Sequence, residues 1–169
     1  MKKLLVLRHA KSSWAKPELA DFDRPLNERG VLAAPFMGSL MTSEGLIPEL
    51  IVSSPAERAK HTAELVKEGG GMKTEIHFEH RIYEASPQTL LQVASEVDPE
   101  LISIMIVGHN PGIEGFIRLL TGVVEAMPTA ALAEIDLEID EWRAITAGCG
   151  KLIRVFRPKD RMKTLGSSG

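Results

Sequence analysis

Leu4-Leu5-Val6-Leu7-Arg8-His9 decides the fold, because a short apolar run ends abruptly there in two basic residues. A similar arrangement occurs twice more. One apolar run covers residues 50–52 and is followed by Arg58, and the other covers residues 104–107 and is followed by His109. Short apolar runs bounded by turn residues are typical of buried strands, and their alternation with helical stretches predicts a parallel sheet. Ligands of such sheets bind outside the carboxyl ends of the strands. We therefore expect these basic residues to gather at one edge.

Proline, serine and asparagine mark the expected helix starts. One helix should follow Asn27, with an apolar stripe at Leu32, Phe36 and Leu40, and Pro35 should either kink it or delay its start. The next should begin with Ser54 as N-cap, Pro55 in the first turn and Glu57 as the reciprocal capping partner, and should end near residues 69–71. Two more helices should start at Ser86-Pro87 and at Asn110-Pro111.

Further strands are expected at 75–78, 130–137 and 151–157, the last two at an edge or antiparallel. The fold class is an α/β, three-layer α/β/α sandwich with a mostly parallel central sheet.

Size and charge set broad limits on the protein. The chain has 169 residues and a formal net charge of −3. We expect one domain over residues 1–158 and a disordered tail over residues 159–169. A chain without excess positive charge is not expected to bind nucleic acid. The apolar start is too short for a secretory signal and no run could span a membrane, so a cytoplasmic location without membrane association is expected. No oligomeric state is predicted.

The residue types at the strand ends predict a phosphate pocket that contains a nucleophile. The guanidinium groups of Arg8 and Arg58 offer paired donors that match phosphate oxygens. The neutral imidazole of His9 can attack phosphorus. His109 precedes a predicted helix N-terminus, whose amides favour an anion. Arg58 should lie near a helix N-terminus, where a cation is unfavourable unless an anion is bound. Each residue alone could be a surface residue, but their recurrence at three strand ends favours one shared site.

A phosphatase also needs a proton for its leaving group, and Glu84, just before a predicted helix, is the candidate acid. Asp21 and Asp23 are alternatives, and they lie in a polar loop over residues 10–26 that is long enough to suggest a functional role. His77 and His80 have the spacing of a metal pair, but no third ligand supports a metal site. His61 fits a simple surface histidine, whereas Thr129 could face the crevice.

Three segments resemble the signatures of the histidine phosphatase superfamily, which has the phosphoglycerate-mutase-like fold. They are Leu7-Arg8-His9-Ala10, Ser53-Ser54-Pro55-x-x-Arg58-x-x-x-Thr62 and Val107-Gly108-His109-Asn110-Pro111. The small size and Arg24-Pro25-Leu26-x-x-x-Gly30 look most like the SixA-type phosphohistidine phosphatases. Ala10 stands where the family usually has glycine, and Ala15 where mutases have asparagine, which weakens a mutase interpretation.

The resemblance implies a mechanism without metal or cofactor. His9 would attack phosphorus and form a phosphohistidine intermediate, while Arg8, Arg58 and His109 would hold the phosphoryl oxygens, and Arg24 would be a further basic residue of the pocket. The substrate would be phosphohistidine in a protein. The alternatives are a small phosphate ester as substrate, or a phosphate-binding module without catalysis.

Overall fold

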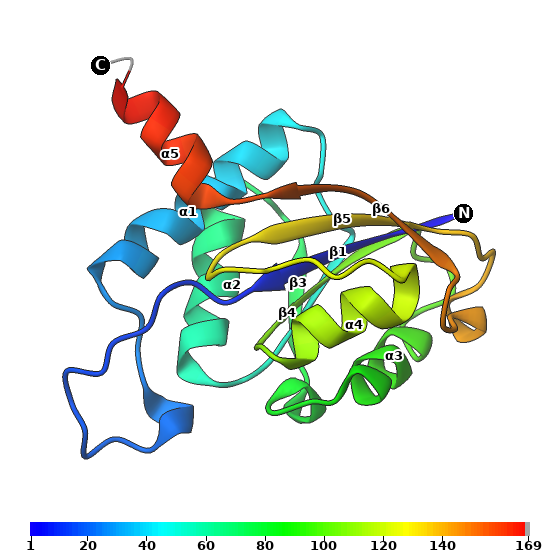
Figure 1. Ribbon diagram of the computed structural model, residues 1–169, viewed down its shortest axis with the longest axis horizontal. Coiled ribbons are helices and arrows are strands. Elements are labelled where there is room, and N and C mark those ends of the chain that lie inside the picture. The colour runs from blue at the N-terminus through cyan, green and yellow to red at the C-terminus, as the bar shows by residue number, and fades with distance from the viewer. Residues whose placement is uncertain (168–169) are drawn as a thin grey trace.

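The computed structural model describes residues 1–167, with side chains up to residue 162, and contains a six-stranded sheet between two layers of helices (Figure 1). The strand order is β3-β2-β4-β1-β5-β6. The strands are β1 (Lys2–Arg8), β2 (Leu50–Ser53), β3 (Glu75–Phe78), β4 (Ser103–Gly108), β5 (Leu132–Leu137) and β6 (Gly150–Phe156). β1 to β4 are parallel, and β5 is antiparallel to both of its neighbours. The predicted mostly parallel sheet and the two late strands are confirmed.

Alternate residues of β1 belong to two separate cores, which explains its continuous apolar run. Leu4 and Val6 pack in a core with α3 (Pro87–Ser95) and α4 (Gly112–Thr121). Leu5 and Leu7 pack in the other core, with α1 (Glu28–Ser43) and α2 (Glu57–Gly69). The three-layer α/β/α sandwich is therefore confirmed.

α1 differs from its predicted pattern. It begins directly after Asn27, whose Oδ1 accepts from the Gly30 amide at 2.9 Å, and it runs on through Pro35, so a later start is excluded. Its fully buried apolar side chains are Ala34, Met37 and Met41, whereas Leu32 is 64% exposed. Phe36 and Leu40 are partly buried and pack against the same core, so the predicted stripe is confirmed at these two residues and wrong at Leu32.

Close contact with α2 explains this difference. A side chain at Gly38 of α1 would lie 2.0 Å from the carbonyl oxygen of Val66, and one at Gly69 of α2 would lie 2.2 Å from that of Pro35. The two helices meet at Gly38 and Gly69, and this close contact sets the face of α1 that points to the core, with Met37 and Met41 fully buried and Leu32 outside it. The spacing of apolar residues does not register contact through glycine, so it cannot predict the face of α1 that packs against α2.

Two predicted helix starts are shifted by a few residues. α2 begins at Glu57 with Ala56 at the N-cap position, and no side chain caps it. Ser54 lies before the helix, and its hydroxyl accepts from the Ala56 amide at 3.2 Å. α4 begins at Gly112 after Pro111, although the Asn110 side chain still accepts from the Glu114 amide at 3.3 Å. α3 begins as predicted, with the Ser86 hydroxyl accepting from the Thr89 amide.

The last described segment is helical, where a disordered tail was expected. α5 covers Pro158–Ser167. Pro158 suits the first helical position and Asp160 lies in the first turn, where the helix dipole favours an acid. Arg161 lies over the Phe156 ring, 5.3 Å from its centroid. Residues 168–169, the end of the expected tail, lie outside the described residues. Within the described chain, no helix is long and apolar enough to cross a membrane.

Candidate active site

The carboxyl ends of the parallel strands bring the predicted basic residues together. Arg8 is the last residue of β1 and His9 follows it, Arg58 lies in the first turn of α2 after β2, and His109 follows β4. These four side chains and Arg24 line one pocket of about 400 Å³. Strand pairing accounts for their proximity, because β1 lies next to β4 and β4 next to β2.

The hydrogen bonding of His9 defines which of its ring nitrogens is free. Its Nδ1 lies 2.7 Å from the carbonyl oxygen of Ala10. A carbonyl oxygen only accepts, so Nδ1 carries the proton, and the neutral ring keeps its lone pair on Nε2. Burial, with smaller contributions from Arg58, Arg8 and Arg24, lowers the pKa of His9 to about 4. At neutral pH His9 is therefore an uncharged imidazole with a free Nε2.

This depressed pKa predicts the titration of His9. The NMR signal of its Cε1 proton, assigned by its absence from His9→Ala, should titrate with a midpoint near pH 4. The neutral form of His9, with a free Nε2, then prevails above pH 4 and is lost as the pH falls below 4, so it should remain fully populated between pH 7 and pH 5. A midpoint at or above the usual value of about 6.5 would contradict the neutral, buried imidazole.

His109 lies beside His9, with 5.1 Å between the ring centroids. Its Nε2 is 2.8 Å from the Ser54 hydroxyl, so the serine displaced from the helix cap contacts this histidine instead. Burial, and then the neighbouring His9 and Arg58, lower its pKa to about 3. Among the described side chains, His109 Nδ1 and Arg8 Nε are the buried polar atoms without a partner. Both residues line this pocket, so these two nitrogen atoms remain available to form hydrogen bonds with a bound molecule.

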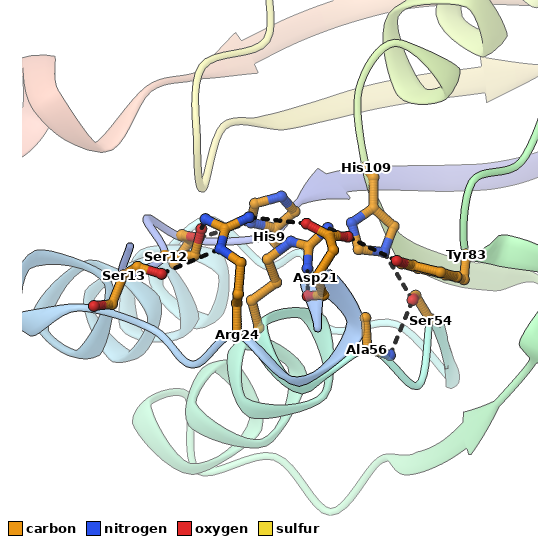
Figure 2. Close-up of polar contacts among 11 residues, drawn as sticks. His9, Ser12, Ser13, Asp21, Arg24, Ser54, Ala56, Tyr83 and His109 are labelled. Atoms are coloured by element: carbon orange, nitrogen blue, oxygen red, sulfur yellow. Dashed lines mark hydrogen bonds and ion pairs between the residues drawn. The ribbon is translucent and has the colours of Figure 1, made fainter. Parts of the chain in front are cut away.

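Asp21 holds two of the arginines in place (Figure 2). Arg58 donates to its carbonyl oxygen at 2.7 Å and to Oδ2 at 3.0 Å, and Arg24 donates to Oδ1 at 3.0 Å. The Tyr83 hydroxyl donates to Oδ2 at 2.7 Å. The hydrogen bond from Tyr83, followed by those from Arg24 and Arg58, lowers the pKa of Asp21 to about 2. Asp21 is thus the counter-ion that Arg58 needs at a helix N-terminus.

Arg24 is fixed on several sides at once. Its guanidinium group donates to the Ser12 hydroxyl at 2.5 Å and to the Ser13 carbonyl at 3.2 Å. The indole ring of Trp14 lies against it, with 3.2 Å between the guanidinium carbon and the ring centroid. The predicted role of the loop over residues 10–26 therefore has a physical basis, because the loop carries both an arginine of the pocket and the groups that orient it.

We expect Asp21→Ala to lower kcat/KM about tenfold, equivalent to about 1.4 kcal/mol, because Arg58 and Arg24 lose the carboxylate that orients them. Tyr83→Phe, which removes a single hydrogen bond to the same carboxylate, should cost less. Steady-state kinetics with one phosphorylated substrate would compare the two variants. A rise in kcat/KM for Asp21→Ala would show instead that the carboxylate mainly repels the substrate.

The pocket is strongly cationic although the whole chain is acidic. Arg8, Arg24, Arg58 and Lys11 line it, and no Asp or Glu does. The net charge of the chain is −3. Such a local cluster, together with a buried neutral imidazole, suits binding and attack of a phosphoryl group.

The structure does not bring Glu84 to this pocket. Glu84 is exposed and absent from the lining, and its backbone has a φ of 57°, in the left-handed region that non-glycine residues seldom adopt. The ring of the preceding Tyr83 packs edge-on against His109, with 5.6 Å between centroids. Of the alternative acids, Asp21 is ionised by its partners. Asp23 does not line the pocket.

Of the remaining residues considered in the sequence, one lines the pocket and the others lie outside it. Thr129 lines the pocket, whereas His61 does not. His77 pairs with Glu75 at 3.1 Å, and no group of three or more potential metal-ligating side chains occurs in the described part of the chain. Ser54, Tyr83 and the anchoring role of Asp21 were not predicted. The long polar loop was the one signal that could have indicated Asp21.

Comparison with known proteins identifies the class. Residues 4–90 match the model of the histidine phosphatase superfamily (branch 1). That range contains Arg8, His9 and Arg58, and the fold and the strand-end site agree with it. The chain belongs to the histidine phosphatase superfamily.

Within this superfamily the chain is of the SixA type. SixA from Agrobacterium tumefaciens, a candidate phosphohistidine phosphatase, is 30% identical, with a TM-score of 0.80 over 93% of this chain and 98% of that one. An uncharacterised chloroplastic protein of Arabidopsis thaliana is 30% identical over 88% of this chain and 72% of its own length. The protein histidine phosphatase SixA in complex with tungstate shares the fold at 17% identity, with a TM-score of 0.78 over 94% of this chain and 99% of that one. The protein is therefore a phosphatase of this class.

Proposed function

We propose that this phosphatase removes the phosphoryl group from phosphohistidine in a protein, without a metal ion. The observation that carries the proposal is the state of His9: its Nδ1 proton is held by the Ala10 carbonyl, and its pKa of about 4 leaves Nε2 free among three arginines. The likeness to SixA supports phosphohistidine as the substrate. A cytoplasmic location stays part of the proposal.

The reaction has two displacements. His9 Nε2 attacks phosphorus, a new N–P bond forms, and the bond from phosphorus to the substrate's imidazole nitrogen breaks. The leaving imidazole takes up a proton from solvent, and the water of the second step returns one to solvent. Water then attacks the phosphorylated His9, and inorganic phosphate and free His9 result. Arg8, Arg58 and His109 donate hydrogen bonds to the phosphoryl oxygens and offset the charge of the transition state.

The test is phosphate release from a histidine-phosphorylated carrier protein in the presence of a chelator, beside a panel of small phosphate esters. Rapid release from the carrier that is unaffected by the chelator supports the proposal. A strong preference for a small ester would overturn the substrate assignment but keep the mechanism. Loss of activity that a divalent cation restores would overturn metal independence.

Glu84 as proton donor remains a prediction, and the leaving group provides its test. An alkoxide needs a proton more than the imidazole of phosphohistidine does, because imidazole is the far weaker base. If Glu84, which lies outside the pocket in this structure, is the acid, Glu84→Gln should lower hydrolysis of an alkyl phosphate about 100-fold and leave phosphohistidine hydrolysis nearly unchanged. Glu79→Gln, at an exposed salt bridge with Arg81, is a matched control. Equal rates of ester hydrolysis in Glu84→Gln and wild type would exclude Glu84 as the acid.

A further inference from the structure

A second and larger pocket adjoins the first. It has a volume of about 530 Å³ and is lined by the first half of α1, by residues 128–129 before β5, and by the start of α5. Lys11 and Thr129 line both pockets, so the second continues from the candidate active site. α5 reaches it because β6 runs in the same direction as β1 and delivers the helix to the same edge of the sheet (Figure 1).

Part of the lining of this second pocket is apolar. Leu32, Pro128, Pro158 and Met162 contribute to its lining. Leu32 is 64% exposed, because α1 turns a different face, with Ala34, Met37 and Met41, toward the core. Of these, Leu32 and Pro128 are exposed. Apolar side chains that line a concave surface beside a functional site are typical of an interaction surface.

Basic residues also line the second pocket. Arg29, Lys159 and Lys11 line it, and no acidic residue does. None of these three forms a salt bridge in the part of the chain that the structure describes. These cations are therefore free to pair with carboxylates of a bound molecule. Complementary charge between such a pocket and a bound molecule accelerates their association and favours some binding partners over others.

We propose that the second pocket binds the segment of the phosphorylated protein next to its phosphohistidine, and that this segment carries an apolar side chain flanked by Asp or Glu. The proposal rests on the proposed function, because the phosphoryl group fixes one end of the segment in the first pocket. The apolar side chain would enter between Leu32 and Met162, and its carboxylates would pair with Arg29 and Lys159. The pocket would thus select among phosphorylated proteins.

Three histidine-phosphorylated substrates test this: a peptide with leucine and glutamate beside the phosphohistidine, a matched peptide with serine and lysine, and phosphoimidazole, which has no flanking residues. Wild type should prefer the acidic peptide. Arg29→Glu combined with Leu32→Asp should lower kcat/KM for that peptide about tenfold, equivalent to about 1.4 kcal/mol, and change phosphoimidazole hydrolysis less than twofold. Arg118→Glu, an exposed arginine on α4, is the matched control.

A binding measurement separates this inference from the proposed function. Fluorescence anisotropy of the labelled, unphosphorylated acidic peptide should show weaker binding to the double variant than to wild type, whether or not phosphohistidine is hydrolysed. Failure of wild type to hydrolyse any of the three substrates would overturn the proposed function. Equal peptide binding by wild type and the double variant would overturn the proposed role of the second pocket. An equal loss of kcat/KM for the acidic peptide and phosphoimidazole would overturn it too. A change of oligomeric state in the double variant would also overturn it, since the pocket would then be a contact between copies of the chain.

Discussion

His9→Ala should lower kcat/KM by about 10⁴-fold, because His9 is the proposed nucleophile and its loss would leave only the contribution of the surrounding binding groups. His9 is 6% exposed, and a hydrogen bond of 2.7 Å fixes its ring. A side chain from the protein surface is therefore not expected to occupy the position of its Nε2 in the variant. Phosphate release from the histidine-phosphorylated carrier measures the loss. Mixing wild type with radiolabelled substrate and quenching rapidly in base should trap a phosphoenzyme, which is stable there and labile in acid, and His9→Ala should not form it.

His77→Ala is the matched control, because His77 is an exposed histidine on β3 outside the pocket and should keep full activity. Thermal unfolding followed by circular dichroism would establish that His9→Ala is folded. A folded His9→Ala protein with more than about a tenth of wild-type activity would contradict the assignment of the nucleophile. A trapped phosphoenzyme in that variant would point to His109 instead.

The strand ends were predictable from sequence because they depend on a general property of parallel sheets. Each short apolar run identifies a strand, and parallel strands present their carboxyl ends at one edge. Arg8, His9, Arg58 and His109 could therefore be placed together before their distances were known. Their order across the sheet, with β1 beside β4 and β4 beside β2, was not needed for that conclusion.

The contacts that orient these residues could not be predicted in the same way. Asp21 reaches Arg58 through a loop whose path follows no periodic pattern, and Tyr83 reaches Asp21 from 62 positions away in the sequence. Ser54 has the sequence context of a helix cap, yet its hydroxyl contacts His109. The buried face of α1 depends on close contact at glycines, which apolar periodicity does not register. Local signals thus identified the reactive groups, whereas their supports arise from tertiary structure.

Arg58→Ala is expected to lower kcat/KM by about 10²- to 10³-fold, because a fixed charged donor at the phosphoryl group acts mainly in the transition state. Arg58 is almost fully buried, and two hydrogen bonds to Asp21 fix its guanidinium group before substrate binds. Arg58→Lys should recover only part of the loss, since an ammonium group lacks the paired donors that bind Asp21 and phosphate together. Steady-state kinetics would show the loss mostly in kcat. Arg118→Ala is the control on an exposed helix surface.

A double-mutant cycle connects this prediction to the role of Asp21. If Asp21 acts by orienting Arg58, then adding Asp21→Ala to Arg58→Ala should cost less than the tenfold expected for Asp21→Ala alone, with only the contribution through Arg24 remaining. Strictly additive losses would show that Asp21 acts independently of Arg58. An unchanged kcat/KM in Arg58→Ala would remove Arg58 from the phosphate site altogether, and the phosphoryl group would then be held by Arg8 and Arg24 with the two histidines.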